Sequence, residues 1–367
     1  MKYTLATAAH GAALRRMARE QAMPGWVRLA FAREPDWSLG HEVLGHLNQT
    51  LVALDDADTV VGCGVRAVRK VYINGLITDV GYLCGLRSLP RARRSLTLAH
   101  AYRFFRRLHD GDRLVPAYLS MIVENNGAAQ ELLTSGRASL PAYLDRGRLI
   151  TSAILLGRRR AAVLPPEGVE IRTGGDVSLE AILDFLHEEG PKHQFFPVLD
   201  RDDFGKPQWR DLDPSGFRVA LRQGTVIGVT AVWDQSAYRQ TVVTGYAPAL
   251  RFARPLLNTV WRIAGRRPLP PPGQYLKFFH TAFTCIRNSD PVVFGALLEH
   301  LHADFRHSAY DYFVVGLHER DPLRAALRGF LSCDYVSRLY LVCWEDGRPF
   351  CEALRPDLIP HLETATL

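Results

Sequence analysis

The feature that most constrains the fold of this chain is an internal repeat. The segment VALDDADTVVGCGVRAV, which begins at Val52, resembles VALRQGTVIGVTAVW, which begins at Val219, about 167 residues later. Both combine an extended run, a polar turn and a second extended run, which is the pattern of a β-hairpin. LATAAHGAAL, from Leu5, and IRTGGDVSLEA, from Ile171, match at nearly the same spacing. Two matches at one spacing predict a chain built from two copies of one unit.

A basic stretch that contains proline separates the two copies. Residues 157–168 read GRRRAAVLPPEG, which is the composition of a linker. The length of 367 residues also exceeds that of one ordinary domain. We therefore predict a first domain at residues 1–156, a linker at 157–168, a second domain at 169–350 and a C-terminal tail at 351–367.

The first copy alternates between strand and helix patterns. Strands are predicted at residues 3–7, 77–88 and 117–123, around the hairpin, and helices at 12–21, 39–47, 94–108 and 128–134. Leu98, Ala101, Tyr102 and Phe105 recur at spacings of three and four, which predicts a helix with one buried face. This order of elements predicts an α/β fold with a mixed sheet.

Two local sequences in the first copy carry a family resemblance. Residues 81–98, GYLCGLRSLPRARRSLTL, resemble a strand-to-helix junction that continues with Gln or Arg, two residues and a glycine, and Arg93 takes the Gln or Arg position. Residues 118–143, YLSMIVENNGAAQELLTSGRASLPAY, resemble the strand and helix that follow. The chain is thus similar to the GCN5-related N-acetyltransferase (GNAT) superfamily. The resemblance implies two tandem GNAT-like acyl-CoA N-acyltransferase domains, the second a degenerate copy.

The resemblance implies that acetyl-CoA, or another acyl-CoA, binds where the strand meets the helix. Backbone groups at the strand end can pair with the pantetheine amides, and a helix N-terminus offers free N–H groups and its dipole to the pyrophosphate. Arginines there would add charge-assisted contacts. The expected cofactor-binding residues are Leu86, Ser88, Leu89, Arg91, Arg93, Arg94, Ser95, Leu96, Asn125 and Asn126.

The two segments depart from the family pattern at three places. Leu96 and Leu98 stand where the family has small residues, which crowds the approach of the phosphates. An ordinary strand-to-helix turn with solvated arginines fits the same junction. The family's tyrosine on the second helix is replaced, because Leu132 and Leu133 occupy that stretch. Tyr143 is the expected substitute.

The reaction of this family is direct attack of an amine on the thioester, which needs a base, oxyanion donors and an acid for the departing thiolate. The resemblance implies Glu124 and Asp79 as candidate bases, the Leu89 amide as an oxyanion donor and Tyr143 as the acid. Glu124 and Asp79 also fit as surface carboxylates, and Tyr143 as a half-buried strand residue. The expected acceptor is the amine of a small molecule or peptide.

The second copy lacks a cofactor signature at residues 275–301. Its aromatic residues can either wall an acceptor pocket or pack in the core. They are His193, Phe195, Phe196, Trp209, Trp233 and Tyr238. His41 and His46 lie one residue too far apart for a zinc-protease helix motif, and no metal site is predicted.

Composition limits the classes of partner. The net charge of +7 comes mostly from arginine and suits an anionic ligand. Because the arginines gather at the junction and the linker, no nucleic-acid groove is predicted. Transfer from charged tRNA therefore ranks behind acyl-CoA binding without turnover, which itself ranks behind acyl transfer. Dispersed cysteines, no signal peptide and no membrane-spanning run predict a cytoplasmic protein without a membrane partner. The oligomeric state is not indicated.

Overall fold

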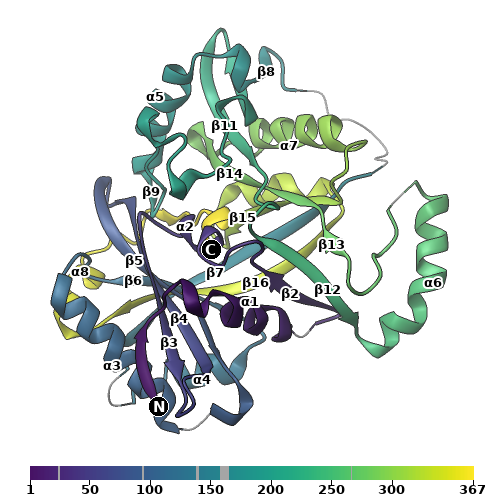
Figure 1. Ribbon diagram of the computed structural model, residues 1–367. Helices are drawn as coiled ribbons and strands as arrows, with labels where there is room; N and C mark the ends of the chain where they lie inside the picture. Colours follow the sequence, from purple (N-terminus) through teal and green to yellow (C-terminus); the bar gives the residue numbers. More distant parts are fainter. Residues whose placement is uncertain (24, 93–94, 138–139, 158–164, 266) are drawn as a thin grey trace.

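Strands from both halves of the chain form one continuous sheet. In the computed structural model, which describes all residues except 24, 93–94, 138–139, 158–164 and 266, the sheet has twelve strands (Figure 1). In spatial order they are β1 (Lys2–Leu5), β3 (Leu47–Leu54), β4 (Val60–Ile73), β5 (Leu76–Ser88), β6 (Tyr118–Val123), β16 (Ser332–Cys343), β7 (Ala142–Leu155), β15 (Tyr312–His318), β14 (Phe278–Ile286), β11 (Thr225–Trp233), β10 (Phe217–Arg222) and β8 (Val169–Thr173). Neighbours are antiparallel except for two parallel pairs, β5 with β6 and β14 with β15. The predicted mixed α/β sheet is confirmed.

The centre of this sheet is an exchange of strands between the two halves. β7 ends the first half of the chain but pairs with β15 of the second, and β16 of the second half pairs with β6 of the first. β7 and β16 also pair with each other. The predicted division at residues 157–168 falls between β7 and β8 in the chain. The two halves nevertheless share one sheet, to which each contributes five strands of its own and one that completes its partner.

Helices occupy equivalent places in the two halves. They are α1 (Gly11–Glu20), α2 (Leu39–Glu42), α3 (Ser95–Asp112), α4 (Gly127–Leu133), α5 (Leu179–Glu189), α6 (Pro248–Ile263), α7 (Pro291–Phe305) and α8 (Arg348–Glu352). α1 follows β1 as α5 follows β8, and α3 follows β5 as α7 follows β14. The predicted face of α3 is buried, since Tyr102 and Phe105 pack in one cluster with Leu83 and Tyr118 of the parallel strands.

The helix predicted at residues 39–47 is shorter than expected, because α2 ends at Glu42. Gly45 lies against β4, where a β-carbon would come 2.1 Å from the carbonyl oxygen of Val68. The backbone must pass that close to enter β3 beside β4, and a helix continued through this point has no room. The long-range contact therefore overrides the local helical pattern.

Two small sheets lie outside the main one, and the first of them joins the two halves. β2 (Val27–Ala32) pairs with β12 (Gln240–Tyr246), which pairs with β13 (Tyr275–Leu276), and β9 (His193–Gln194) pairs with β17 (Ile359–Pro360). Residues 351–367, expected as a tail, return to the middle of the molecule, where Leu362 and Ala365 are buried (Figure 1).

Candidate functional site

The parallel strands β5 and β6 part soon after they meet. Their register contains only the pairs Gly81 with Tyr118 and Tyr82 with Leu119. The Ser120 hydroxyl then donates to the Leu83 carbonyl at 2.9 Å. Beyond this bond β5 follows β4, and β6 follows β16. We call the region between residues 83–88 of β5 and 120–123 of β6 the first wedge.

A bulge in β5 exposes its backbone to the first wedge. The register of β4 with β5 shifts between Cys63 and Val65, and Gly85 has φ of +63°, a conformation that favours glycine. Leu86 is 43% exposed although it lies on a central strand of the sheet. Exposed backbone and an exposed apolar side chain at the middle of a sheet are features that an extended ligand can cover.

The predicted cofactor residues follow one another along this rim. Leu86 and Ser88 end β5, and Ser95 begins α3. The Leu89 amide, predicted as an oxyanion donor, already donates to the Val61 carbonyl at 2.8 Å. Arg91 is exposed and contacts Asp55 at 3.2 Å. Arg93 and Arg94 lie outside the described residues, as do the side chains of Ser95 and Leu96.

The opposite rim is formed where β6 ends and α4 begins. Asn125 and Asn126 are exposed, and the Asn126 side chain caps α4 by accepting the Ala129 N–H at 3.2 Å. Glu124 is held by Arg148 of β7, whose Nε lies 2.5 Å from its Oε1. Glu124 and both asparagines therefore share the rim of the first wedge, and the Glu124 carboxylate already has a cationic partner.

The two other predicted catalytic residues lie in different places. Asp79 pairs with Lys70 of β4, before β5 meets β6, and the His46 Nε2 lies 3.9 Å from its Oδ1. Tyr143 of β7 lies beneath α3, where its hydroxyl is hydrogen-bonded to that of Tyr102. Burial raises the pKa of Tyr143 to about 12, although hydrogen bonds from Tyr102 and Ser120 act in the opposite direction. Tyr143 is thus a protonated hydroxyl beside Ser120, the residue that closes the first wedge.

The partners of Tyr143 were not predicted as site residues. Tyr102 was recognised only as part of the buried face of α3, and Ser120 only as part of a strand. Each lies on a different element, so only the three-dimensional fold brings the three hydroxyl groups together. The sequence signal available was a serine, Ser120, within a run of large apolar and aromatic residues, YLSMIV.

A second group of side chains collects around Cys84, on β5. Burial raises the pKa of Cys84 to about 11, against the opposing charges of four guanidinium groups. These belong to Arg69, Arg239, Arg33 and Arg87. Burial holds the pKa of Arg33 well below its usual value, and the charges of Arg239 and Arg87 lower it further. None of the four forms an ion pair with an Asp or Glu side chain in the part of the chain that the structure describes.

Two of these arginines are held by the C-terminal segment. Arg69 stacks over the Tyr82 ring, 4.4 Å from its centroid, and donates at 2.9 Å to both the hydroxyl and the carbonyl of Thr366. Arg239 donates to the main-chain oxygens of Ala365 and Leu367. The C-terminal segment therefore binds both guanidinium groups.

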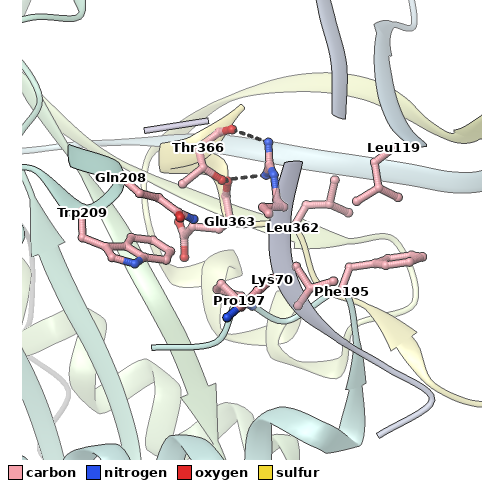
Figure 2. Close-up of a pocket in the computed structure, with 11 residues that line it drawn as sticks. Lys70, Leu119, Phe195, Pro197, Gln208, Trp209, Leu362, Glu363 and Thr366 are labelled. Carbon is pink, nitrogen blue, oxygen red and sulfur yellow. Dashed lines mark hydrogen bonds between the residues drawn. The ribbon is translucent and has the colours of Figure 1, made fainter. Parts of the chain in front are cut away.

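A small cavity lies beside Arg69, between the two halves (Figure 2). Its lining includes Leu119 of β6, Phe195, Trp209 and Glu363. Glu363 was not predicted, and no local pattern marks it. Burial raises the pKa of Glu363 to about 7, against the hydrogen bonds that it accepts from Phe283 and Ala365. Of the aromatic residues predicted for an acceptor pocket, Phe195 and Trp209 line this cavity, while Phe196, Trp233 and Tyr238 are core residues.

The second half repeats the wedge, but its own chain fills it. β14 and β15 pair over three residues from Phe278 with Tyr312, and Thr281 then donates to the Val314 carbonyl at 2.9 Å, as Ser120 does in the first half. Residues 363–366 occupy the space beyond. The Glu363 carboxylate accepts the Phe283 N–H of β14 at 2.7 Å. Thr364 packs on β15, where a β-carbon on Gly316 would lie 1.9 Å from its methyl group.

The helix after the second wedge is also capped by its own chain. The Asp290 side chain accepts the Val292 N–H at 2.8 Å at the start of α7. A carboxylate at this helix terminus occupies a donor and repels a phosphate. The first wedge is therefore the better candidate for a phosphorylated ligand.

The protein resembles solved structures, although its sequence matches no protein-family model and no curated protein. Among solved structures, Saccharomyces cerevisiae N-myristoyltransferase with bound myristoyl-CoA has a TM-score of 0.56 at 9% identity, over 93% of this chain and 78% of that one. A GCN5-related N-acetyltransferase from Anabaena variabilis has a TM-score of 0.51 at 11% identity, over 93% and 72%.

A third match is one region of a larger protein. The GCN5-related glucosamine N-acetyltransferase region of a fungal multi-domain β-N-acetylglucosaminidase has a TM-score of 0.52 at 13% identity. The match covers 83% of this chain but only 34% of that chain. These likenesses extend over most of the present chain. The chain therefore has the fold of the GCN5-related N-acetyltransferases.

Proposed function

We propose that the protein is an acyl-CoA-dependent N-acyltransferase that transfers an acyl group, acetyl in the first instance, to the amine of a small molecule or peptide. The observation that carries this proposal is the contrast between the two wedges. The first leaves Gly85 and Leu86 exposed on a central strand, whereas the second is filled by residues 363–366. The first wedge is available to a ligand, whereas the second is occupied by the protein's own C-terminal segment.

The first wedge suits the extended pantetheine of an acyl-CoA. The parted edge of β5 can pair with its amides as a neighbouring strand would, and α3 presents its N-terminus at the end of that edge. Asn126 lies on the opposite rim, but its side-chain oxygen already accepts a hydrogen bond that caps α4. We assign the thioester to the closed end, beside Ser120, because the buried hydroxyl groups converge there.

The proposed reaction is a single displacement. The amine nitrogen bonds to the thioester carbon, the carbon–sulfur bond breaks, and the departing thiolate takes the proton of the Tyr143 hydroxyl. The amine must lose one proton to a base. Glu124 and Asp79 remain candidates, and Glu363 joins them because burial raises its pKa to about 7, which suits a base at neutral pH.

The acceptor that we propose carries an anionic group besides its amine. Arg33, Arg69, Arg87 and Arg239 surround Cys84, and none of them forms an ion pair with an Asp or Glu side chain among the described residues. An anionic ligand would supply the missing ion pair and offset the cost of desolvating these cations. An amino acid or acidic peptide supplies both the amine and the anion. Replacing Arg87 with Gln should raise KM for such acceptors and leave KM for the acyl-CoA unchanged.

Acyl-CoA binding without turnover is the second candidate. It is favoured by the ion pair between Glu124 and Arg148, which occupies the only described carboxylate on the rim next to the asparagines. A protein of this kind would bind acyl-CoA as tightly as an enzyme but release no CoA with any amine.

Isothermal titration with acetyl-CoA and with a long-chain acyl-CoA tests the proposal. Wild-type protein should bind at least one, and Leu86→Asp should weaken binding on the order of 10-fold, because it adds a negative charge where an anionic ligand lies. Leu76→Asp is the matched control, since Leu76 is an exposed leucine at the other end of β5. No binding by the wild type, or equal loss in both variants, would overturn the site. Measuring the release of CoA in the presence of a panel of amines then distinguishes an enzyme from a protein that only binds acyl-CoA.

A further inference from the structure

α6 carries a row of exposed apolar side chains. Phe252 is 81% exposed, Leu256 73%, Val260 52% and Ile263 83%. These residues are three or four apart, so they lie along one side of the helix. Figure 1 shows α6 at the margin of the molecule, beyond β12 and β13. We call these four residues the apolar row.

The other side of α6 attaches it to the protein. Asn258, the buried residue of this helix, exchanges hydrogen bonds with the backbone of Leu269 at 3.1 and 2.7 Å. Arg254 donates to the Pro270 carbonyl at 3.2 Å and lies over the Tyr246 ring. Because these contacts fix the orientation of α6, the apolar row faces solvent in the folded protein.

The segment of the chain that contains the apolar row is basic. Between Asp234 and Asp290 the sequence contains no acidic residue but seven arginines and one lysine. Arg251 and Arg262 of α6 are exposed, and neither has an acidic partner among the described residues. Like-charged arginines on both copies would oppose each other if two molecules joined through this face.

An exposed tryptophan stands at the base of α6. Trp26 is 69% exposed, and its carbonyl accepts the Ala247 N–H, the residue before α6, at 2.9 Å. Tryptophan favours the boundary between headgroups and acyl chains because its ring is apolar and its N–H is polar. The exposed Arg28 follows two residues later.

We propose that α6 and Trp26 bind the surface of an anionic lipid bilayer. The apolar row enters the boundary between headgroups and acyl chains, and Arg251 and Arg262 contact the acidic headgroups. A nucleic acid would satisfy the arginines but offers no partner for four aliphatic or aromatic side chains in a row. The sequence predicted no membrane partner because it has no spanning run, and no helix within the described residues could cross a bilayer. Surface binding needs no span, and it is independent of acyl transfer.

Vesicle flotation tests this surface. The full chain should float with phosphatidylcholine vesicles that contain about one third phosphatidylserine, and much less with phosphatidylcholine alone. The double variant Phe252→Asp, Ile263→Asp should bind on the order of 10-fold more weakly. The control, Leu76→Asp with Ile77→Asp, makes the same change at residues that are 71% and 58% exposed on β5 and should bind as the wild type does. Arg251→Gln with Arg262→Gln should weaken binding to the anionic vesicles and reduce its salt dependence.

Three results would overturn the proposal. The first is equal flotation of the α6 double variant and the wild type, with circular dichroism showing both folded. The second is a concentration-dependent dimer in sedimentation velocity that the α6 variant abolishes, in the absence of vesicle binding. The third is binding to single-stranded RNA that the arginine variant abolishes and the aspartate variant retains, again without vesicle binding.

Discussion

The Tyr118 ring lies directly over Gly81 on the neighbouring parallel strand. A β-carbon at position 81 would come 2.0 Å from the ring, a distance that no side chain tolerates. Gly81 also donates its N–H to the Ala117 carbonyl at 2.9 Å, so its backbone cannot move aside cheaply. These contacts hold β5 and β6 together at the point from which they part.

Replacing Gly81 with alanine should therefore destabilise the protein and disturb the first wedge. We expect a loss of at least about 2 kcal/mol in the free energy of unfolding, because the added methyl group overpacks a rigid site. Denaturant unfolding measures it. Gly111→Ala in α3 is the control, since nothing lies within 4 Å of its β-carbon and alanine favours a helix. Equal stability of the two variants would contradict this explanation.

A charge network centred on the buried Arg66 holds Tyr118 in place. Arg66 is fully buried, donates to Asp112 at 2.7 and 2.8 Å, and bonds the Tyr118 hydroxyl at 3.0 Å. Asp112→Asn leaves the Arg66 charge without a counter-ion, which should cost on the order of 3 kcal/mol. Asp110→Asn, which breaks an exposed pair with Arg106 on the same helix, should cost no more than about 1 kcal/mol. Thermal unfolding of both variants measures the two losses of stability, and equal losses would contradict the idea that the burial of Arg66 makes its ion pair more important.

Local patterns predicted most of the fold. The hairpins at Val52 and Val219 lie in equivalent strand pairs, β3 with β4 and β10 with β11, because alternation and turn residues are local signals. The exchange of β7 and β16 was not predicted. Both strands have ordinary alternating patterns, and nothing in such a pattern says which distant strand completes which half of a sheet.

The residues of the candidate site also fall into those that local sequence patterns predict and those that only long-range contacts bring together. The rim from Leu86 to Arg91 was predicted because it is contiguous in sequence and resembles a known junction, and its role in cofactor binding stays a prediction. Tyr102, Ser120 and Glu363 were missed, since each is ordinary in its own segment and acquires a role only from neighbours far along the chain. Arg91 was expected to face a phosphate, and its guanidinium group contacts Asp55 of the β3–β4 turn, a long-range contact that no local pattern predicts.

Tyr143→Phe tests the assigned acid. The variant keeps the ring and loses only the hydroxyl, so acyl-CoA binding should be unchanged while the rate of CoA release falls on the order of 100-fold. Tyr340→Phe is the control, because Tyr340 packs edge-on against Tyr143 and lies on the neighbouring strand β16. A similar rate in Tyr143→Phe and the wild type would remove Tyr143 from the mechanism.

Glu363 should make stability depend on pH. Burial raises its pKa from 4.5 to about 7, so between these values the unfolded chain releases a proton that the folded protein retains. Stability then falls as pH rises through this range, by on the order of 3 kcal/mol. Buried His280 and His361 act with the opposite sign, because their lowered pKa values make stability fall as pH decreases.

The difference between Glu363→Gln and the wild type isolates the glutamate from these histidines. Glutamine cannot ionise, so the variant should gain stability relative to the wild type as pH rises from about 4.5 to about 7, and the gain should level off above that range. Denaturant unfolding at a series of pH values measures the difference, and Glu131→Gln on α4 provides an exposed control. A difference that stays constant with pH would mean that Glu363 is ionised throughout. The arginine beside the cavity would then be its ion-pair partner, and Glu363 would lose its place among the candidate bases.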